Sequence, residues 1–182
     1  MHIKAYKKCI APLILGCVLS GTLIFVKRQF IYNPSPSLTK GYYFTYPIIE
    51  PKVDDIVLLC IWDESHIEVL HQLGLPYKSD ECPRNTPYLM KQIVTKEGDE
   101  VSVSVDGVRV NNYSYKNSRI VQKSRQINLL PLKFGSFKLK HNEYFVLGVT
   151  PHSYDSRYFG VINRKQIYRR AKLVYATNQM LW

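Results

Sequence analysis

The fold is decided by the stretch QIVTKEGDEVSVSVDGVRV at residues 92–110. Within it Val101, Val103 and Val105 alternate with polar residues, which is the pattern of a strand that buries one face. The dipeptide Asp-Gly at 106–107 follows, and Asp-Gly between two strand patterns favours a tight turn. The stretch therefore predicts an antiparallel β-hairpin.

Other strand patterns surround this hairpin. They are IVLLCIW at 56–62, FKLKHNEYFVLGV at 137–149, SRYFGVI at 156–162 and AKLVYA at 171–176. Residues 63–87 have several charged, Gly and Pro positions, and residues 112–136 are rich in Asn, Ser and Lys, so we expect loops in both. No long helical periodicity appears after residue 26. We therefore predict a mainly β domain.

The charge of the chain is unevenly distributed. Its net charge is +11 over 182 residues, and all fourteen acidic residues lie beyond residue 49, so the N-terminal part is purely basic. A late basic cluster consists of Arg164, Lys165, Arg169, Arg170 and Lys172. Such a cluster can meet lipid headgroups or nucleic-acid phosphates, but a solvated strand edge is the interpretation we favour. We expect no nucleic-acid partner.

An apolar segment, CIAPLILGCVLSGTLIFV at 9–26, lies between basic flanks. Eighteen helical residues span about 27 Å, just enough to cross the hydrocarbon core of a membrane. This length exceeds that of a typical cleaved signal peptide, so we predict an uncleaved N-terminal transmembrane helix. The positive-inside rule places residues 1–8 in the cytoplasm and residues 29–182 outside. A cleaved leader and a buried core helix are the alternatives.

The four cysteines fit this topology. Cys9 and Cys17 lie inside the apolar segment, whereas Cys60 and Cys82 lie in the part predicted to be exported. Disulfides persist outside the cytoplasm, so we predict a Cys60–Cys82 bridge. Closing this loop would stabilise the fold by roughly 3 kcal/mol in the chain-entropy model. Two free, buried thiols are the alternative.

A serine-containing loop, NPSPSLTKGYY at 33–43, begins seven residues after the apolar segment, so its reactive groups would lie close to the membrane. It resembles the signal peptidase I superfamily, most closely the TraF-type peptidases of conjugative transfer. Their motif is Asn-x-Thr/Ser-x-Ser-x-Pro-x-Gly-x-Tyr, and the matching residues here are Asn33, Ser35, Ser37, Gly41 and Tyr43. Thr39 stands at the motif's proline position, which makes the loop less rigid. The resemblance implies that Ser37 is the nucleophile.

Two further segments extend the resemblance over the rest of the chain. PYLMKQIVTKEGDEV at 87–101 is similar to the family's Leu-Leu-Lys-Arg-Val-x-x-x-x-Gly-Asp-x-Val box, which places Lys91 at the general base position. SYDSRYFG at 153–160 is similar to its Ser-x-Asp-Ser-Arg-Tyr-aromatic-Gly box. Upstream, the tripeptide Gly-Val-Thr at 148–150 departs from the usual Gly-Asp-Asn or Gly-Asp-His. The resemblance implies a signal peptidase-like β catalytic domain.

A Ser/Lys pair has a chemical rationale. A serine hydroxyl is a weak nucleophile and needs a neighbouring base. Lysine titrates near 10.4, and bringing its pKa to roughly 7 or 8 means disfavouring the ammonium by about 3–5 kcal/mol, which burial among apolar groups supplies. Lys91 has Leu89, Met90 and Ile93 as neighbours, whereas Lys96 lies in the polar turn Lys-Glu-Gly-Asp. We therefore expect Lys91 to be the base.

The resemblance also implies supporting roles for other residues. Ser153 would hydrogen-bond and orient the general base. Ser35 would join the backbone N–H of Ser37 in an oxyanion hole, which stabilises the negative charge that develops on the substrate. Asp155 and Arg157 would form a structural ion pair beneath the site and take no part in the chemistry.

Other interpretations stay open at this point. Ser37, His152 and Asp155 are the residue types of a Ser-His-Asp triad. Taken singly, the serines between prolines fit a plain turn, the lysine of the second box fits a surface lysine, and the third box fits a polar turn. His66 and His71 lack convincing metal-ligand spacing, and we expect no metal and no cofactor.

The resemblance as a whole implies a membrane-anchored serine endopeptidase of the inner membrane, with its catalytic domain on the periplasmic side. Its substrate would be an exported precursor, foremost a conjugative pilin subunit that is matured by hydrolysis or by cyclisation onto its own amino terminus. Components of a conjugative type IV secretion system are the expected partners. The alternatives are a general leader peptidase acting on many exported proteins and a catalytically inactive scaffold of the secretion system.

Overall fold

A computed structural model of the protein describes Gly16, Ser20, Val26 and residues 29–75, 80–124 and 127–177. Within this part of the chain, no helix is both long enough and apolar enough to cross a membrane. The predicted transmembrane segment at 9–26 lies outside the described residues except for three positions, and residues 1–8 lie outside them entirely. The membrane anchor therefore stays a prediction.

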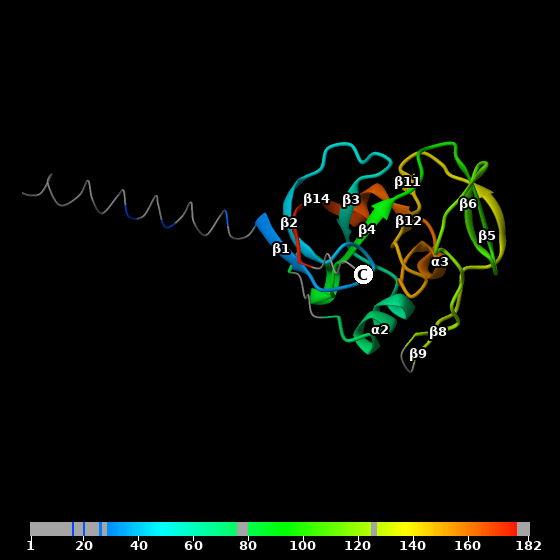
Figure 1. Ribbon diagram of the computed structural model, residues 1–182, viewed down its shortest axis with the longest axis horizontal. Coiled ribbons are helices and arrows are strands. Elements are labelled where there is room, and N and C mark those ends of the chain that lie inside the picture. The colour runs from blue at the N-terminus through cyan, green and yellow to red at the C-terminus, as the bar shows by residue number, and fades with distance from the viewer. Residues whose placement is uncertain are drawn as a thin grey trace, which may run out of the picture.

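The larger sheet has six antiparallel strands in the order β1-β2-β14-β3-β4-β12 (Figure 1). The strands are β1 (Phe30–Asn33), β2 (Gly41–Pro47), β3 (Ile56–Leu59), β4 (Leu89–Ile93), β12 (Val146–Leu147) and β14 (Ile167–Ala176). The strands expected within 56–62 and at 171–176 are confirmed. Because β14 lies between β2 and β3, the N-terminal hairpin joins the rest of the sheet through the C-terminal strand.

The smaller sheet contains the predicted hairpin. Its order is β10-β5-β6-β7, with the strands β5 (Glu100–Ser104), β6 (Gly107–Val110), β7 (Tyr113–Ser114) and β10 (Gly135–Lys138). The pairing of β5 with β6 sets Ser104 opposite Gly107. Val105 and Asp106 therefore form the turn, one position earlier than the predicted Asp-Gly pair.

Short elements complete the described fold. They are the strand pairs β8 (Lys123–Ser124) with β9 (Ile127–Asn128) and β11 (Glu143–Tyr144) with β13 (Ile162–Asn163), and the 3₁₀ turns Pro83–Asn85 and Arg164–Gln166. The loop predicted at 112–136 is irregular apart from such two-residue strands and the start of β10. The mainly β character of the domain is confirmed.

The loop predicted from residue 63 onward contains a helix, α2 (Glu64–Gln72), so that prediction is wrong. Asp63 begins the helix by accepting a hydrogen bond from the Ser65 N–H. Ile67 and Leu70 are buried three residues apart, on the side that packs against the larger sheet. Tertiary packing stabilises this short helix, and nine residues give only a weak periodic signal in the sequence.

A second helical segment, α3 (Ser156–Phe159), begins the stretch predicted to be a strand at 156–162. Asp155 accepts a hydrogen bond from the Arg157 N–H and so caps this single turn. Gly160 ends it with a φ of 78°, which a residue with a side chain rarely adopts. Only the end of the predicted strand is extended, where β13 begins.

Both faces of β3, a central strand of the larger sheet, are buried. Val57 and Leu59 of β3 pack in the same cluster as α2, whereas the intervening Leu58 packs with Tyr43 and Met90 on the other face. Side chains alternate between the faces of a strand, so the central strands have no face open to water. A polar side chain on these strands is therefore also removed from solvent.

The late basic cluster is not a solvated strand edge, because β14 is an interior strand of the larger sheet. Arg170 forms an ion pair with Asp55, with an N–O distance of 2.5 Å. Arg169 donates through Nε to the hydroxyl oxygen of Thr45 in β2 at 3.0 Å. These arginines hold β14 to its neighbours. The expectation of a strand edge is wrong because β14 pairs with strands from distant parts of the sequence on both of its sides.

The predicted disulfide is present between Cys60 and Cys82, with Cα atoms 5.4 Å apart. Cys60 directly follows β3, and Cys82 directly precedes the 3₁₀ turn that leads to β4. Helix α2 lies between the two cysteines in the chain. The bridge therefore ties together the two ends of the segment that carries α2.

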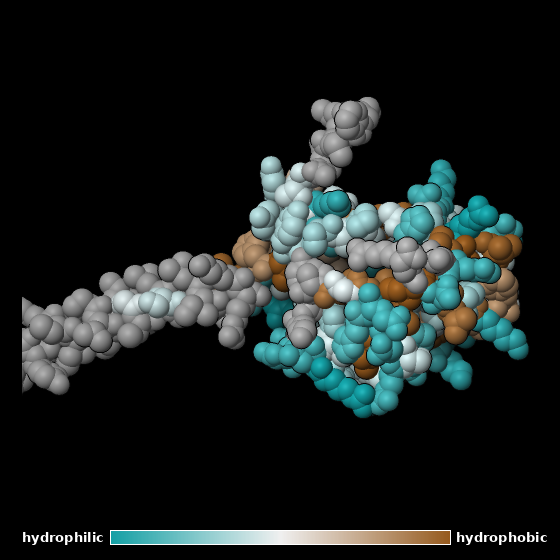
Figure 2. Space-filling model, turned by 90° about the horizontal axis from the view of Figure 1, so that it is seen from below, coloured by the Kyte–Doolittle hydropathy of each residue, from teal (hydrophilic) through white to brown (hydrophobic). Residues whose placement is uncertain are grey.

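The surface of the domain is mixed in character. Figure 2 shows hydrophilic and hydrophobic side chains interspersed over one face, with hydrophobic atoms gathered toward the end that holds β5 and β6. Val105, in the β5–β6 turn, and Phe134, just before β10, are among the exposed apolar residues of this part. The larger sheet, with α2 and β1, lies toward the other end of the domain (Figure 1).

Candidate active site

The loop between β1 and β2 carries Ser37 and is held in shape by two side chains. Asn33 accepts a hydrogen bond from the Ser35 N–H at 3.1 Å and donates to the carbonyl oxygens of Ser35 at 3.0 Å and Thr39 at 3.1 Å. The Tyr43 hydroxyl donates to the same Thr39 carbonyl at 2.7 Å. Thr39, which replaces the family's proline, is thus fixed through its backbone. These bonds supply rigidity that the missing proline ring would otherwise give.

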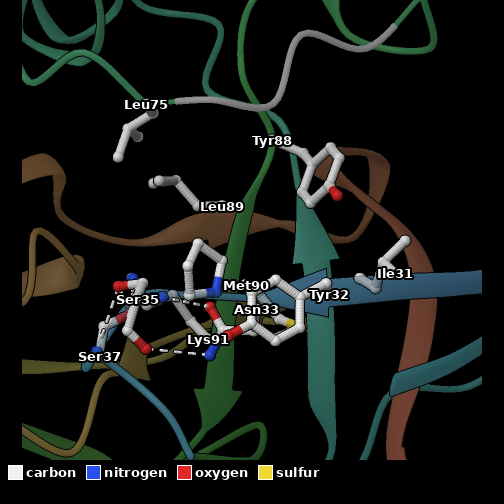
Figure 3. A pocket seen from close by; sticks show the side chains of 11 residues that line it. Ile31, Tyr32, Asn33, Ser35, Ser37, Leu75, Tyr88, Leu89, Met90 and Lys91 are labelled. Carbon is white, nitrogen blue, oxygen red and sulfur yellow. Dashed lines mark hydrogen bonds between the residues drawn. The ribbon is translucent and has the colours of Figure 1, made fainter. Parts of the chain in front are cut away.

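Ser37 and Lys91 meet in the interior of the domain (Figure 3). The Lys91 amine donates to the Ser37 hydroxyl oxygen at 3.1 Å, and the side chains come from the β1–β2 loop and from β4. Ser37 is 7% exposed and Lys91 is 4% exposed. Burial lowers the pKa of Lys91 from 10.5 to about 8, although the charge of Asp155 partly opposes the shift. The amine can therefore be neutral close to physiological pH.

Ser35 lies beside the same hydroxyl. Its side-chain oxygen is 2.9 Å from the Ser37 hydroxyl oxygen and accepts a hydrogen bond from the Ser37 N–H at 3.2 Å. The two groups expected to form an oxyanion hole are therefore adjacent, but they are bonded to each other. To stabilise a substrate oxygen, both must donate to it, so the Ser37 N–H has to exchange this partner for the substrate.

Ser153 was expected to hydrogen-bond to Lys91, but its hydroxyl makes no such bond. The residue is 2% exposed, and within the described part of the chain its hydroxyl has no hydrogen-bond partner. Ser153 instead lies against Gly148, where an added Cβ would come within 2.2 Å of its hydroxyl oxygen and 2.8 Å of the Ser37 carbonyl oxygen. Only glycine at 148 lets the loops that carry these two serines approach so closely.

Asp155 and Arg157 form the ion pair that was expected. Both are fully buried, and the guanidinium binds the carboxylate through two N–H···O bonds of 2.7 Å. The remaining guanidinium donors reach the carbonyl oxygens of Arg119, Thr150, Pro151 and Ser153. Every N–H of this buried cation is satisfied, which is the condition under which a buried ion pair is tolerated.

The ion pair is linked to Ser37 through the backbone. Asp155 accepts a hydrogen bond from the Gly148 N–H at 2.9 Å, and the next N–H, that of Val149, donates to the Ser37 carbonyl oxygen at 2.8 Å. The peptide that follows Ser37 is therefore oriented by a chain of bonds that ends at Arg157. This gives the pair a structural role next to the site.

The alternative triad is not assembled. His152 is exposed and makes no hydrogen bond to Ser37 or to Asp155, all three being described residues. Both carboxylate oxygens of Asp155 are already bound by Arg157 and by backbone N–H groups. The basic side chain in contact with Ser37 is therefore that of Lys91.

A histidine that the sequence did not place lies nearby. Nδ1 of His66, on α2, is 2.7 Å from the hydroxyl of Tyr154, the residue after Ser153. Burial lowers the pKa of His66 and raises that of Tyr154, so both are neutral near pH 7 and share one hydrogen bond, whose direction is set by the tautomer of the ring. The sequence does contain a signal for α2. Asp63 is a typical helix N-cap, and the apolar residues Ile67 and Leu70 follow it at helical spacing.

Two cavities flank the Ser37–Lys91 pair. The first is lined by Ile31, Tyr32, Asn33, Pro34, Tyr88 and Met90, and the second by Pro36, Leu73, Thr150, His152, Ser153 and Tyr154. Both also include Ser35, Ser37, Leu75, Leu89 and Lys91. The pair thus lies at the junction of two largely apolar hollows, which suits an extended polypeptide with apolar side chains.

A family model described as signal peptidase, peptidase S26, matches residues 3–176. The chain belongs to this signal peptidase family. The match extends over almost the whole sequence, including all three boxes recognised above. The expected membership of the signal peptidase I superfamily is thus confirmed.

Parts of the chain are similar to known proteins. Two plasmid transfer proteins TraF from Escherichia coli are each 35% identical to the chain over 88 residues, which is 47% of this chain. The matched part spans only about half the length of these relatives, 50% of one and 49% of the other. A crystal structure of a signal peptidase I from Enterococcus faecalis is 22% identical and covers 66% of this chain and 95% of its own, with a TM-score of 0.36.

Proposed function

We propose that the chain is a serine endopeptidase of the signal peptidase type, with Ser37 as nucleophile and Lys91 as general base. The observation that carries the proposal is the 3.1 Å contact between the two side chains in a buried site that lowers the pKa of Lys91 to about 8. A neutral amine within hydrogen-bond reach of a serine hydroxyl is the arrangement that proton transfer requires.

In the acylation step, the Ser37 oxygen forms a bond to the substrate's peptide carbonyl carbon while its proton passes to the neutral Lys91 amine. The negative charge on the carbonyl oxygen is stabilised by the Ser37 N–H and the Ser35 hydroxyl. The Lys91 ammonium then gives its proton to the departing amine as the carbon–nitrogen bond breaks. An ester on Ser37 and a free amino terminus result, and Lys91 is neutral again.

The ester is resolved by a second nucleophile activated by the same lysine. Water gives a linear product with a new carboxyl group, whereas an amino group of the substrate gives a new peptide bond and, within one chain, a circular product. Both routes return the proton to the Ser37 oxygen through Lys91. In this proposal Ser153 orients the Lys91 amine once substrate has entered, because its buried hydroxyl has no hydrogen-bond partner within the described residues and lines the same cavity as Lys91.

The substrate we propose is an exported precursor protein, and more specifically a pilin subunit of a conjugative transfer system. Membership of the signal peptidase family supports the first statement, and similarity to plasmid transfer proteins supports the second. Components of the type IV secretion apparatus are the partners that this substrate implies. The apolar segment at 9–26 would hold the catalytic domain on the periplasmic side of the inner membrane.

The test is intact-mass measurement of the pilin-like precursor encoded with the protein, coexpressed with the wild type, with Ser37→Ala or with Ser114→Ala. Ser114 is an exposed serine in the smaller sheet and serves as the matched control. We expect a truncated product with the wild type and Ser114→Ala, and none with Ser37→Ala. A product one water lighter than its linear form identifies cyclisation.

Cleavage that persists in Ser37→Ala would overturn the proposed mechanism. An unchanged pilin precursor together with Ser37-dependent cleavage of other exported proteins would instead identify a general leader peptidase. If Ser37→Ala abolishes the cleavage of no protein at all, the chain is an inactive scaffold.

A further inference from the structure

The segment from α2 to Leu75 supplies one wall of the candidate active site. Leu73 is the C-cap of α2 and lines the second cavity, and Leu75 lies two residues later and lines both cavities. Leu89 lines both as well, but it belongs to β4 and is fixed by the sheet that carries Lys91. The contribution of Leu75 depends instead on how α2 is held.

Figure 3 shows where this wall lies. Leu75 and Leu89 are on one side of the cavity, Tyr88 and Ile31 are on the other, and the Ser37–Lys91 contact lies at its base. A side chain of an extended substrate that occupies this cavity can contact Leu75. Leu75 packs against the core cluster but is only half-buried, so its exposed side can contact such a side chain.

Three features fix α2 against the sheet. Ile67 and Leu70 are buried in the core, and the Cys60–Cys82 disulfide joins the two ends of the segment. His66 is bonded to Tyr154, which itself lines the second cavity next to Ser153. The helix is therefore tied to the same box of residues that approaches Ser37.

We infer that Leu75 is a specificity-determining residue that sets the size of the apolar substrate side chain accepted beside Ser37, and that the His66–Tyr154 hydrogen bond positions it. The inference rests on the proposed peptidase function. An apolar wall discriminates by shape, so a change of one or two methylene groups shifts preference between substrates by roughly tenfold or more.

The experiment compares wild type, Leu75→Ala and Leu75→Phe on peptides that span the cleaved bond of the precursor. The residue before the bond, and separately the third residue before it, is varied through Ala, Val, Leu and Phe. We expect Leu75→Ala to raise kcat/KM for a larger side chain relative to Ala at one position by roughly tenfold, and Leu75→Phe to lower it. Leu130→Ala, a change at a residue that is 84% exposed, is the control and should leave the ratios unchanged.

The outcomes separate the inference from the function on which it rests. Size ratios that are the same in all variants, with cleavage still dependent on Ser37, overturn the role of Leu75 alone. A wild-type protein that fails to cleave, or that cleaves equally well as Ser37→Ala, overturns the peptidase proposal and the inference with it.

The positioning role of His66 and Tyr154 has its own readout. Tyr154→Phe keeps the ring and removes the hydrogen bond, so we expect KM to rise several-fold with kcat little changed, and the size ratios to broaden as in Leu75→Ala. His66→Gln retains a side chain that can bond the hydroxyl and should restore part of the selectivity relative to His66→Ala. A fall in kcat with unchanged KM and unchanged size ratios would contradict the positioning role.

Discussion

Lys91 and Arg157 are both buried cationic side chains in one domain, yet their surroundings are opposite. Arg157 meets a carboxylate and four backbone carbonyls, so all of its donors are satisfied. Lys91 has a hydrogen bond to the neutral Ser37 hydroxyl and lies among apolar side chains. A full set of partners keeps one cation charged, whereas burial without a carboxylate partner among the described residues brings the other close to losing its proton.

The largest expected effect comes from making the lysine site resemble the arginine site. Lys91→Arg puts a group that cannot lose its proton next to Ser37, so we expect cleavage to fall by about a thousandfold or more. The measurement is kcat/KM on the precursor peptide, with thermal unfolding to show that the variant is folded. His152→Ala should keep most of the activity, and the reverse result would revive the Ser-His-Asp alternative.

The next prediction removes the negative charge that pairs with Arg157. Asp155→Asn leaves the Arg157 charge buried without its counter-ion and should lower the free energy of unfolding by about 3–5 kcal/mol. Lys91→Met replaces a buried amine by an apolar side chain of similar length and should leave the stability unchanged or raise it. Urea unfolding at pH 7 measures both. Equal losses in the two variants would mean that the two cations are not held differently.

A third prediction concerns the stability of the wild type as the pH changes. The pKa of Lys91 is 10.5 in an unfolded chain and about 8 in the folded protein, so between these values the unfolded chain binds more protons. Stability should therefore rise with pH across this window, by about 3 kcal/mol from this residue. Lys91→Met lacks the group, so the difference between the two urea titrations isolates it. A flat difference from pH 8 to 10.5 would refute the lowered pKa.

The same shift predicts how activity depends on pH. Lys91 acts as a base only when neutral, so kcat/KM should rise about tenfold per pH unit below the folded pKa and level off above about 8. A pH–rate profile on the precursor peptide measures the inflection. An inflection near 6.5 would indicate a histidine base instead.

The smallest effect concerns Ser153, a buried hydroxyl with no partner in the described structure. Ser153→Ala removes an unsatisfied polar group, so we expect the free energy of unfolding to stay the same or to rise by up to about 1 kcal/mol. Activity should still fall by roughly tenfold if the hydroxyl orients Lys91 in the substrate complex. A variant with full activity would show that the serine has no such role.

The β5–β6 hairpin, β3 and the end of β14 could be predicted because local pattern carries them, and the Ser37–Lys91 contact because the sequence resembles a known family. Alternating valines mark β5, and the boxes around residues 37 and 91 fix which side chains should meet. The Cys60–Cys82 bridge was also accessible, because only these two cysteines lie outside the apolar segment. In each case the deciding information lies within a short stretch of sequence or in a simple count.

What could not be predicted depends on contacts between distant segments. A cluster of basic residues predicts solvent-exposed arginines in β14, but Arg170 pairs with Asp55, more than a hundred residues earlier in the chain. The turn of α3 depends on Asp155, whose carboxylate also binds Gly148 and Arg157. The bond between His66 and Tyr154 likewise joins segments that no local pattern connects.

The place of β14 in the larger sheet means that this sheet is complete only when the end of the chain is in place. Ser37 lies between β1 and β2, Lys91 lies on β4, and β14 is the strand between β2 and β3 that joins the two parts. During synthesis, a chain without residues 167–176 has Ser37 and Lys91 on separate pieces of an unfinished sheet. The contact between these two side chains therefore forms only after β14 has paired with both of its neighbours.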